Sequence, residues 1–256
     1  MTEFRDWYNN VPLFTRVWLT LTIVMSILGR FGLLSYYTMM LDFYPFINKF
    51  QIWRPITALF FYPISPGTGF HFLINCYFLY NYSQRLETGM FAGKPADYLY
   101  MLMFNWLCCV LIGLLVGLPL LMDPMVLSVL YVWCQLNKDV IVSFWFGTRF
   151  KAMYLPWVLL AFNLVISGGG AMELIGILIG HLAFFLLFKY PQEFGGPALL
   201  TPPLFLKQLL PDTRYVGGFG SAPRNVRPAA GGGAPPAAGG GVFGHNWGRG
   251  QTLGGN

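Results

Sequence analysis

The stretch Tyr98–Leu118, YLYMLMFNWLCCVLIGLLVGL, decides the fold, because it contains no charged side chain over its whole length. A helix needs about 20 predominantly apolar residues to cross about 30 Å of hydrocarbon, so this stretch predicts a membrane-spanning helix. Five other stretches read in the same way: Val11–Leu34, Phe70–Tyr82, Met125–Leu136, Met153–Ile166 and Ala171–Phe188. We therefore predict an all-α membrane protein with six transmembrane helices.

The composition of the chain excludes a soluble domain. Hydrophobic residues make up 55% of the chain and charged residues only 10%, with a mean hydropathy of +0.54. A soluble domain carries about 25% charged residues. The apolar residues crowd between positions 11 and 190, and the remainder is rich in Gly, Pro and Arg. We expect a membrane domain over residues 1–190 and a largely disordered cytosolic tail over residues 191–256.

The basic residues predict the orientation. With six spans, one side of the membrane holds both termini and the second and fourth loops, and it carries 13 of the 16 Lys and Arg residues. The positive-inside rule places that side, and so both termini, in the cytosol. The first ten residues lack the basic region and cleavage site of a signal peptide, so we expect the first span to be kept as a signal anchor.

The first loop and the shorter spans are unusual. Residues 35–69 are rich in aromatic side chains and interrupted by prolines, which favours a loop lying in the membrane interface with Arg54 reaching to lipid phosphates. The second, fourth and fifth spans are too short for an ordinary bilayer. Such spans are accommodated by thinning of the membrane or by burial inside the bundle.

Polar residues at membrane depth are costly and usually face a cavity or a partner helix. Three of the predicted spans supply candidates, which are His71, Asn75 and Asn81 in the second, Asn163 in the fifth, and Glu173 and His181 in the sixth. His71 and Asn75 are four residues apart, so they share one helical face and can bind a common group. The alternative is that each polar side chain bonds the backbone of a neighbouring helix.

Two GxxxG patterns, Gly113–Gly117 and Gly176–Gly180, predict close approach of another helix, and the first of them is a candidate for self-association. The cysteines Cys76, Cys108, Cys109 and Cys134 all lie in apolar stretches without disulfide or zinc spacing, so we expect buried apolar thiols. No reaction centre is assembled in the sequence: Ser128 lacks flanking glycines, and no HExxH motif occurs.

Several motifs carry a resemblance to a known family. Trp53–Arg54, His71-x-x-x-Asn75 and Gly176-x-x-x-Gly180 resemble the rhomboid framework. Longer and more specific runs are Ile52–Thr57, Arg85–Gly89, Ser128–Asn137, Val142–Gly147 and Tyr154–Trp157. Together they resemble the derlins, the inactive rhomboid relatives of the endoplasmic reticulum, and most closely the first paralogue of that family. The likeness covers residues 5–215 and the extreme C-terminus, and it implies a rhomboid-like six-helix bundle with an interfacial first loop.

The resemblance also implies that the chain is not an enzyme. In active rhomboids the histidine base lies three residues before the first glycine of the last GxxxG, where this chain has Glu173. The place of the nucleophile falls near Met122. His71 and Asn75, which match the oxyanion side, remain, and such a pair can bind a polypeptide carbonyl without cleaving it. The derlin likeness assigns client engagement and membrane perturbation to Trp53, Arg54, His71 and Asn75, and helix packing to Gly176 and Gly180.

The C-terminal tail contains a second part of the resemblance. Residues 229–241 form a flexible Gly/Ala/Pro linker, and Phe243–Leu253 then restores aromatic and aliphatic residues between glycines. This segment is similar to the motif by which derlins recruit the valosin-containing-protein-type AAA ATPase. The residues that would bind are Phe243, Trp247, Gly248, Arg249, Gly250 and Leu253.

The function implied by the resemblance is a non-enzymatic role in endoplasmic-reticulum-associated degradation and the unfolded protein response. The protein would sit in the endoplasmic reticulum membrane, engage misfolded luminal or membrane proteins, assist their retrotranslocation through a locally thinned membrane and recruit the ATPase. Expected partners also include ubiquitin-ligase complexes, membrane lipid and other copies of the chain, whereas no cofactor, metal or nucleic acid is expected. The alternatives are an intramembrane protease with an unconventional site and a small-solute channel.

Overall fold

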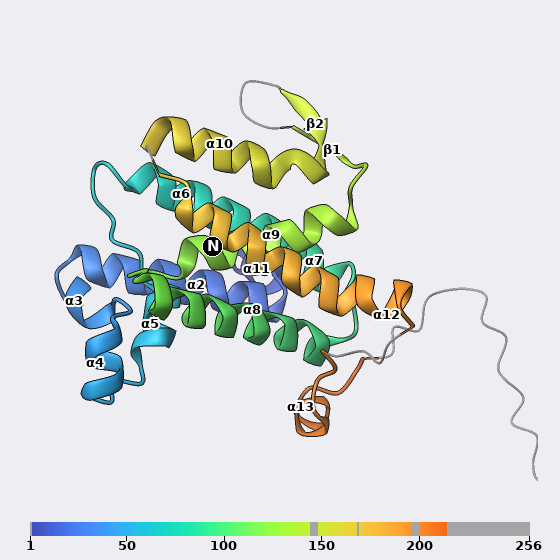
Figure 1. Ribbon diagram of the computed structural model, residues 1–256, viewed down its shortest axis with the longest axis horizontal. Coiled ribbons are helices and arrows are strands. Elements are labelled where there is room, and N and C mark those ends of the chain that lie inside the picture. The colour runs from blue at the N-terminus through green and yellow to red at the C-terminus, as the bar shows by residue number, and fades with distance from the viewer. Residues whose placement is uncertain (1, 144–147, 168, 196–199, 214–256) are drawn as a thin grey trace, which may run out of the picture. The chain divides into compact units, whose positions relative to one another are not determined.

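The computed structural model describes residues 2–143, 148–167, 169–195 and 200–213, and these are largely helical (Figure 1). The chain divides into two compact units, Met1–Tyr215 and Val216–Asn256. The second unit, which contains the linker and the tail motif at 243–253, lies outside the described residues. The first unit continues beyond residue 190, because helix α13 (Leu204–Leu209) buries Leu206.

Three described helices are long and apolar enough to cross a membrane. They are α2 (Leu13–Arg30), α8 (Pro95–Val116), and the helix Ala171–Glu193 made of α11 (Ala171–Phe184), a π-helical turn η4 (Phe185–Lys189) and α12 (Tyr190–Glu193). The shorter apolar helices are α9 (Met122–Leu136) and Ala152–Val165, which comprises a 3-10 turn η3 (Ala152–Tyr154) and most of α10 (Leu155–Ser167). The fold is that of a multi-pass helical membrane protein, and the count of six spans stays a prediction.

The second predicted span is longer than its apolar residues indicate. Helix α6 (Gly69–Phe78), a π-helical turn η1 (Leu79–Ser83) and α7 (Gln84–Thr88) follow one another without a break. The polar end of this segment is partly buried against α2, which the apolar pattern does not reveal. Glu87 accepts hydrogen bonds from the backbone amides of Phe14 (3.0 Å) and Thr15 (2.9 Å), and so caps the start of α2.

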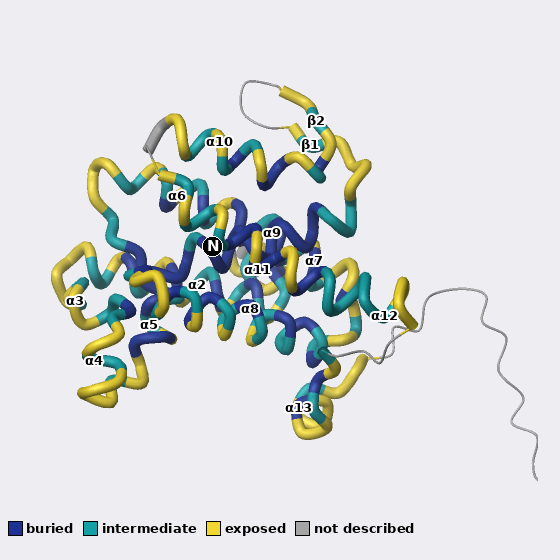
Figure 2. The backbone as a smooth tube through the Cα atoms, viewed as in Figure 1, coloured by how far each residue is buried: buried dark blue, intermediate teal, exposed yellow. Residues whose placement is uncertain are grey.

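Helix α9 lies at the centre of the bundle, where every residue from Pro124 to Cys134 is buried (Figure 2). It contacts α6, α8, α10 and α11. Helix α11 approaches α9 most closely at its glycines. A methyl group added at Gly176 would lie 2.8 Å from the carbonyl oxygen of Pro124, and one at Gly180 would lie 2.7 Å from that of Ser128. Only glycine permits this backbone contact.

The other GxxxG pattern is not a helix-packing face. Gly117 ends α8 in the left-handed conformation with a φ of 78°, and an added methyl group there would meet nothing within 4 Å. The predicted close approach through Gly113 and Gly117 is therefore wrong for Gly117, which serves as a helix terminator.

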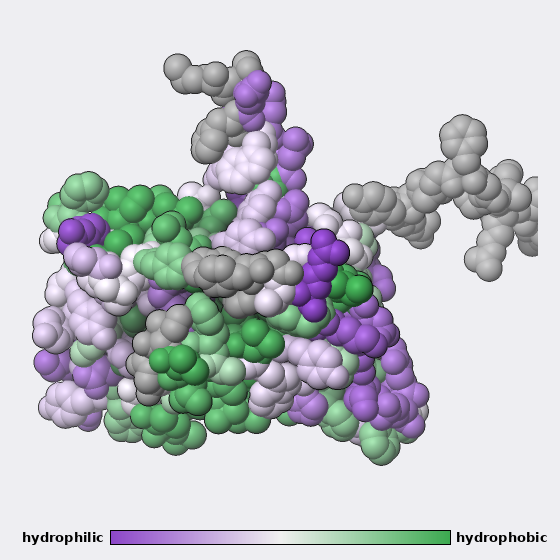
Figure 3. All heavy atoms as spheres, turned by 90° about the horizontal axis from the view of Figure 1, so that it is seen from above, coloured by the Kyte–Doolittle hydropathy of each residue, from purple (hydrophilic) through white to green (hydrophobic). Residues whose placement is uncertain are grey.

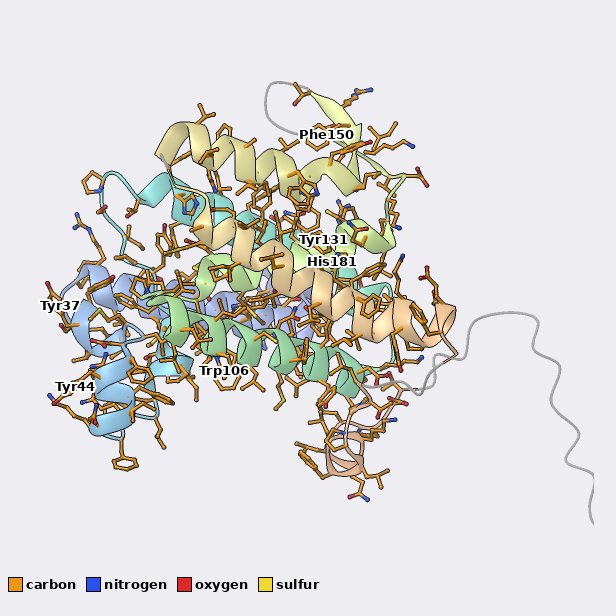
Figure 4. All side chains as sticks on the ribbon, in the orientation of Figure 1. Tyr37, Tyr44, Trp106, Tyr131, Phe150 and His181 are labelled. Atoms are coloured by element: carbon orange, nitrogen blue, oxygen red, sulfur yellow. The ribbon has the colours of Figure 1, made fainter. Side chains whose placement is uncertain are left out.

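The first loop, residues 35–69, is built from three short helices, α3 (Tyr36–Met39), α4 (Phe43–Asn48) and α5 (Arg54–Phe60). Backbone hydrogen bonds join it to the segment between α8 and α9, from Leu41 N to Pro119 O (2.8 Å) and from Leu121 N to Ala58 O (3.0 Å). Helices α3 and α4 are largely exposed in Figure 2 and carry outward-pointing aromatic side chains such as Tyr37 and Tyr44 (Figure 4).

The structure corrects the all-α prediction in one place. Strands β1 (Ile141–Ser143) and β2 (Arg149–Lys151) form an antiparallel pair between α9 and α10. An amphipathic helix α1 (Thr2–Asn10) also precedes α2. In the view of Figure 3, hydrophobic residues cover the middle of the visible face and hydrophilic residues gather toward its right-hand edge, as in a protein whose middle faces lipid.

Candidate functional site

A cavity of about 370 Å³ lies among the helices around α9. Its walls come from α6, α9, α10 and α11, with Val142 and Ser143 of β1 beyond the end of α9. Because the lining includes Asp123 in the first turn of α9 as well as β1, the cavity runs along the length of this helix. Apolar side chains form most of the wall, and the polar ones gather at the end where α9 and α11 begin.

Two of the polar side chains, His71 and Asn75, lie on α6, and Tyr62 contacts His71 from outside the cavity lining. The Tyr62 hydroxyl lies 2.8 Å from His71 Nδ1, and the side-chain amide of Asn75 lies 3.2 Å from the same nitrogen. Tyr62 precedes α6 in the loop after α5, and burial, together with the nearby Asp123 and Glu173, raises the pKa of its phenol. The hydroxyl therefore keeps its proton and is available as a donor to His71.

Asp123 fixes the orientation of Asn75. Asn75 Nδ2 donates to Asp123 Oδ1 at 2.6 Å, so the nitrogen of this amide is the atom that faces His71 Nδ1. A ring nitrogen that accepts from an amide carries no proton, which assigns the imidazole proton to Nε2. That nitrogen lies on the side of Asn163, whose Nδ2 is 3.5 Å away.

Glu173 completes the cluster from α11. Asn163 Nδ2, on α10, donates to Glu173 Oε1 at 2.6 Å. Two hydrogen-bonded groups, Asp123–Asn75–His71 and Asn163–Glu173, thus meet where His71 Nε2 lies 3.5 Å from Asn163 Nδ2, and their residues come from four helices at one end of the cavity. We call these five residues the polar cluster. It offers carboxylate oxygens to a hydrogen-bond donor, and the apolar wall beyond it accepts aliphatic or aromatic groups.

The sequence predicted four of the five residues of the polar cluster but not Asp123. His71, Asn75, Asn163 and Glu173 were candidate polar groups, and the structure brings them together. The alternative, bonds to neighbouring helix backbones, is wrong for all four, which bond side chains.

Asp123 falls between the predicted spans Tyr98–Leu118 and Met125–Leu136, but it lies in the first turn of α9 and accepts from Asn75. The signal that could have placed it there is Pro124, since proline favours the first turn of a helix.

The other two polar residues of the spans lie elsewhere. Asn81 donates to the carbonyl oxygen of Tyr77 in its own helical segment at 2.9 Å. His181 is exposed on α11, and its Nδ1 lies 2.8 Å from the Tyr131 hydroxyl of α9, a pair labelled in Figure 4. Neither residue lines the cavity.

Met122, near the expected place of a nucleophile, and Ser128, the serine of the fourth predicted span, are both buried. Met122 is fully buried in the first turn of α9. The Ser128 hydroxyl is also buried and donates to the carbonyl oxygen of Met125 at 2.7 Å, back along its own helix. Within the residues that the structure describes, no three His, Cys, Asp or Glu side chains are grouped to hold a metal ion.

Trp53 and Arg54 do not line the cavity, and their side chains differ in exposure. Trp53 is 48% exposed, whereas Arg54 is only 5% exposed. The Arg54 guanidinium donates to the Gln51 side chain (2.6 Å) and to the carbonyl oxygens of Tyr37 (3.0 Å) and Met40 (2.7 Å). The prediction that Arg54 reaches to lipid phosphates is wrong, because its donors are directed into the first loop and tie α3 to α5.

The remaining predicted site residues, Phe243, Trp247, Gly248, Arg249, Gly250 and Leu253, lie outside the described residues. The four cysteines are free thiols, with Cys109 and Cys134 buried and Cys76 and Cys108 partly so.

Taken together, the described helices and the polar cavity define a polytopic membrane protein with a hydrogen-bonding site inside its bundle. The sequence pattern of the Der1-like family matches residues 11–204, and the chain belongs to that family.

Curated relatives match along nearly the whole chain. It is 53% identical to Derlin-1 of Homo sapiens over 258 residues, covering 99% of each chain. It is 50% identical to Derlin-1 of Caenorhabditis elegans and 47% identical to Derlin-1 of Drosophila melanogaster, with at least 98% of each chain covered. The predicted resemblance to the derlins, and to their first paralogue in particular, is confirmed.

Proposed function

We propose that this protein acts without catalysis in endoplasmic-reticulum-associated degradation, engaging misfolded luminal or membrane proteins and easing their passage toward the cytosol. Membership of the Der1-like family over residues 11–204 supports the degradation role, as does the likeness to Derlin-1 along nearly the whole chain. The proposed location is the endoplasmic reticulum membrane, with both termini cytosolic.

The observation that carries the passage step is the shortness of the helices beside the cavity. Helix α9 has 15 residues and α10 has 13. At 1.5 Å per residue they span about 22 Å and about 20 Å. Helix α9 is buried inside the bundle, whereas α10 exposes Leu164 and Val165. A bilayer with about 30 Å of hydrocarbon has to thin around α10, which lowers the barrier for a polar polypeptide crossing there. The cavity along α9 provides a protein-lined space in the same place, with polar groups at one end.

The first loop supports the same function from the membrane surface. Exposed aromatic and aliphatic side chains on α3, α4 and the start of α5 suit the interface between hydrocarbon and headgroups. Trp53 is the exposed side chain next to the buried Arg54, so we assign lipid perturbation and client engagement to Trp53 and a supporting role to Arg54. His71 and Asn75 would engage clients inside the cavity.

The energy for extraction would come from partners. We propose that residues 243–253 recruit the valosin-containing-protein-type AAA ATPase, that ubiquitin-ligase complexes modify the emerging client, and that copies of the chain self-associate. The two rival functions make distinct predictions: cleavage of a transmembrane substrate by the purified protein would favour a protease, and conductance without any client would favour a channel.

The test is client turnover in cells that lack the endogenous protein. Re-expressed wild type should restore degradation of a misfolded membrane client, and Trp53→Ala at equal expression should lengthen the client half-life several-fold. A matched exposed position away from the first loop, Trp157→Ala, should restore wild-type turnover. Unchanged half-lives with Trp53→Ala would remove the first loop from the proposal, and failure of wild type to restore turnover would reject it.

A further inference from the structure

The two carboxylates of the polar cluster each use only one oxygen. Asp123 Oδ1 accepts from Asn75 and Glu173 Oε1 accepts from Asn163, both at 2.6 Å. Among the residues that the structure describes, the second oxygen of each carboxylate accepts no hydrogen bond. Both side chains line the cavity, so these oxygens are the strongest acceptors available to a molecule inside it.

No cationic side chain of the protein balances these carboxylates. Neither Lys nor Arg is among the residues that line the cavity, and the described ion pairs, Lys151–Asp139 and Lys189–Glu193, involve other groups. His71 is the one basic group of the cluster, and it already interacts with Tyr62 and Asn75 through Nδ1. The cavity therefore contains two carboxyl groups and one imidazole, that is, more acidic than basic groups.

Local structure stabilises the charged form of these carboxyl groups only in part. Asp123 and Glu173 lie in the first turns of α9 and α11, where the helix dipole favours a negative group. One amide donor and the end of a dipole are weak compared with water or a directly paired cation, which a buried carboxylate normally requires. The mixture of carboxylates, amides and apolar wall is thus complementary to a ligand that carries positive charge on an aliphatic stem.

The size and the walls of the cavity limit the ligand further. A volume of about 370 Å³ is at the small end for ligand pockets, so it accommodates one or two side chains and not a whole helix. Apolar residues such as Phe78, Val126 and Leu159 continue from the polar cluster toward β1. They suit the methylene stem of Lys or Arg, whose charged head would lie between Asp123 and Glu173.

We propose that this cavity is a receptor for a basic side chain, Lys or Arg, presented by a polypeptide segment at membrane depth. This inference rests on the proposed function in one respect, namely that the polypeptide is a client. It makes the polar cluster a specificity-determining site that selects membrane segments containing a misplaced positive charge.

The experiment uses the full-length protein in lipid nanodiscs, with a photo-crosslinking amino acid at Leu159 in the cavity wall. Three synthetic transmembrane peptides differ only in one central residue, which is Lys, Leu or Glu. We expect the Lys peptide to crosslink at least fivefold more than the Leu or Glu peptide. A crosslinker at Leu178, which is exposed on α11, should not discriminate among the peptides. Equal crosslinking of all three at Leu159 would overturn the proposal.

Variants of the two carboxylates test whether these groups are responsible for the preference for the Lys peptide. Asp123→Asn and Glu173→Gln keep an oxygen that accepts from Asn75 or Asn163, so the bundle should fold, as checked by size-exclusion profile and thermal midpoint. The double variant should lose the preference for Lys, and retention of the preference would reject the carboxylates as the site.

A competition arm with spermidine separates a peptide-borne amine from a free one: spermidine that binds through the same carboxylates while the Lys peptide fails to crosslink would overturn the polypeptide as ligand. Equal crosslinking of the three peptides by a wild-type protein that restores normal client turnover in cells would reject this inference and leave the proposed function standing.

Discussion

Asn75 on α6 donates a hydrogen bond of 2.6 Å to Asp123 on α9. The bond joins two helices through residues that are 48 positions apart in the sequence. Asn75 is buried, so removing its amide leaves a carboxylate without its donor in a place that water reaches poorly. We predict that Asn75→Leu lowers the stability of the purified protein by about 2 kcal/mol. Thermal unfolding in mild detergent measures this, and an unchanged midpoint would contradict the structural role of the bond.

The same substitution at Asn105 should have the opposite effect. Asn105 is fully buried on α8, and within the described part of the chain neither its amide nitrogen nor its carbonyl oxygen has a hydrogen-bond partner. A buried unpaired polar group costs roughly 1–3 kcal/mol, so Asn105→Leu should raise the unfolding midpoint. The two variants form a matched pair, and a fall in the midpoint for Asn105→Leu would show that the amide is satisfied after all.

Gly180 permits the contact between α11 and α9. A methyl group there would lie 2.7 Å both from the Ser128 carbonyl oxygen and from Tyr131 Cβ, and neither the backbone nor a Cβ can move alone. Gly180→Ala should destabilise the bundle by about 1–3 kcal/mol through overpacking. Gly67→Ala is the control, because an added methyl group at Gly67 meets nothing within 4 Å. Equal midpoints for the two variants would count against the close helix approach.

Limited proteolysis should distinguish the roles of Arg54 and Trp53. Arg54→Ala removes two hydrogen bonds that tie the end of α3 to α5 and a third to Gln51, so the first loop should be cleaved faster by limited proteolysis. Arg54→Lys should rescue only partly, since an ammonium cannot reproduce the geometry of the guanidinium. Trp53→Ala should leave cleavage unchanged, because its side chain is half exposed. Similar protection of all variants would contradict the role assigned to Arg54.

The C-terminal segment can be tested by deletion. Removing residues 243–253 should abolish co-purification of the AAA ATPase in mild detergent, since the aromatic and aliphatic anchors are lost. Removing residues 229–241 should preserve it, because that linker has no anchoring side chains. Full retention of the ATPase without residues 243–253 would exclude this segment as the binding motif.

The sequence predicted the long apolar helices well, because a helix in lipid must satisfy its own backbone and leaves a continuous apolar stretch. The predicted span Tyr98–Leu118 corresponds to α8, Pro95–Val116, with Gly117 as its terminator. The strands β1 and β2 were missed, since three-residue strands leave no periodicity to detect.

The candidate site was only partly predictable from the sequence. His71 and Asn75 share a helical face by spacing alone, and the sequence could place them together. Nothing local indicates that Asp123 turns toward Asn75, or that the donors of Arg54 point into the first loop, since both depend on packing between elements distant in the chain.

The π-helical turn at Leu79–Ser83 allows one helical segment to serve two different neighbours. An α-helix advances about 100° per residue, and a π turn inserts an additional residue, so the faces before and after it are out of phase by about that angle. His71 and Asn75 can therefore point into the cavity while Glu87 reaches the start of α2. Deleting one residue from this turn would restore a regular helix and rotate Glu87 away from α2, so the extra residue sets the rotational phase between the cavity and the amino-terminal helix.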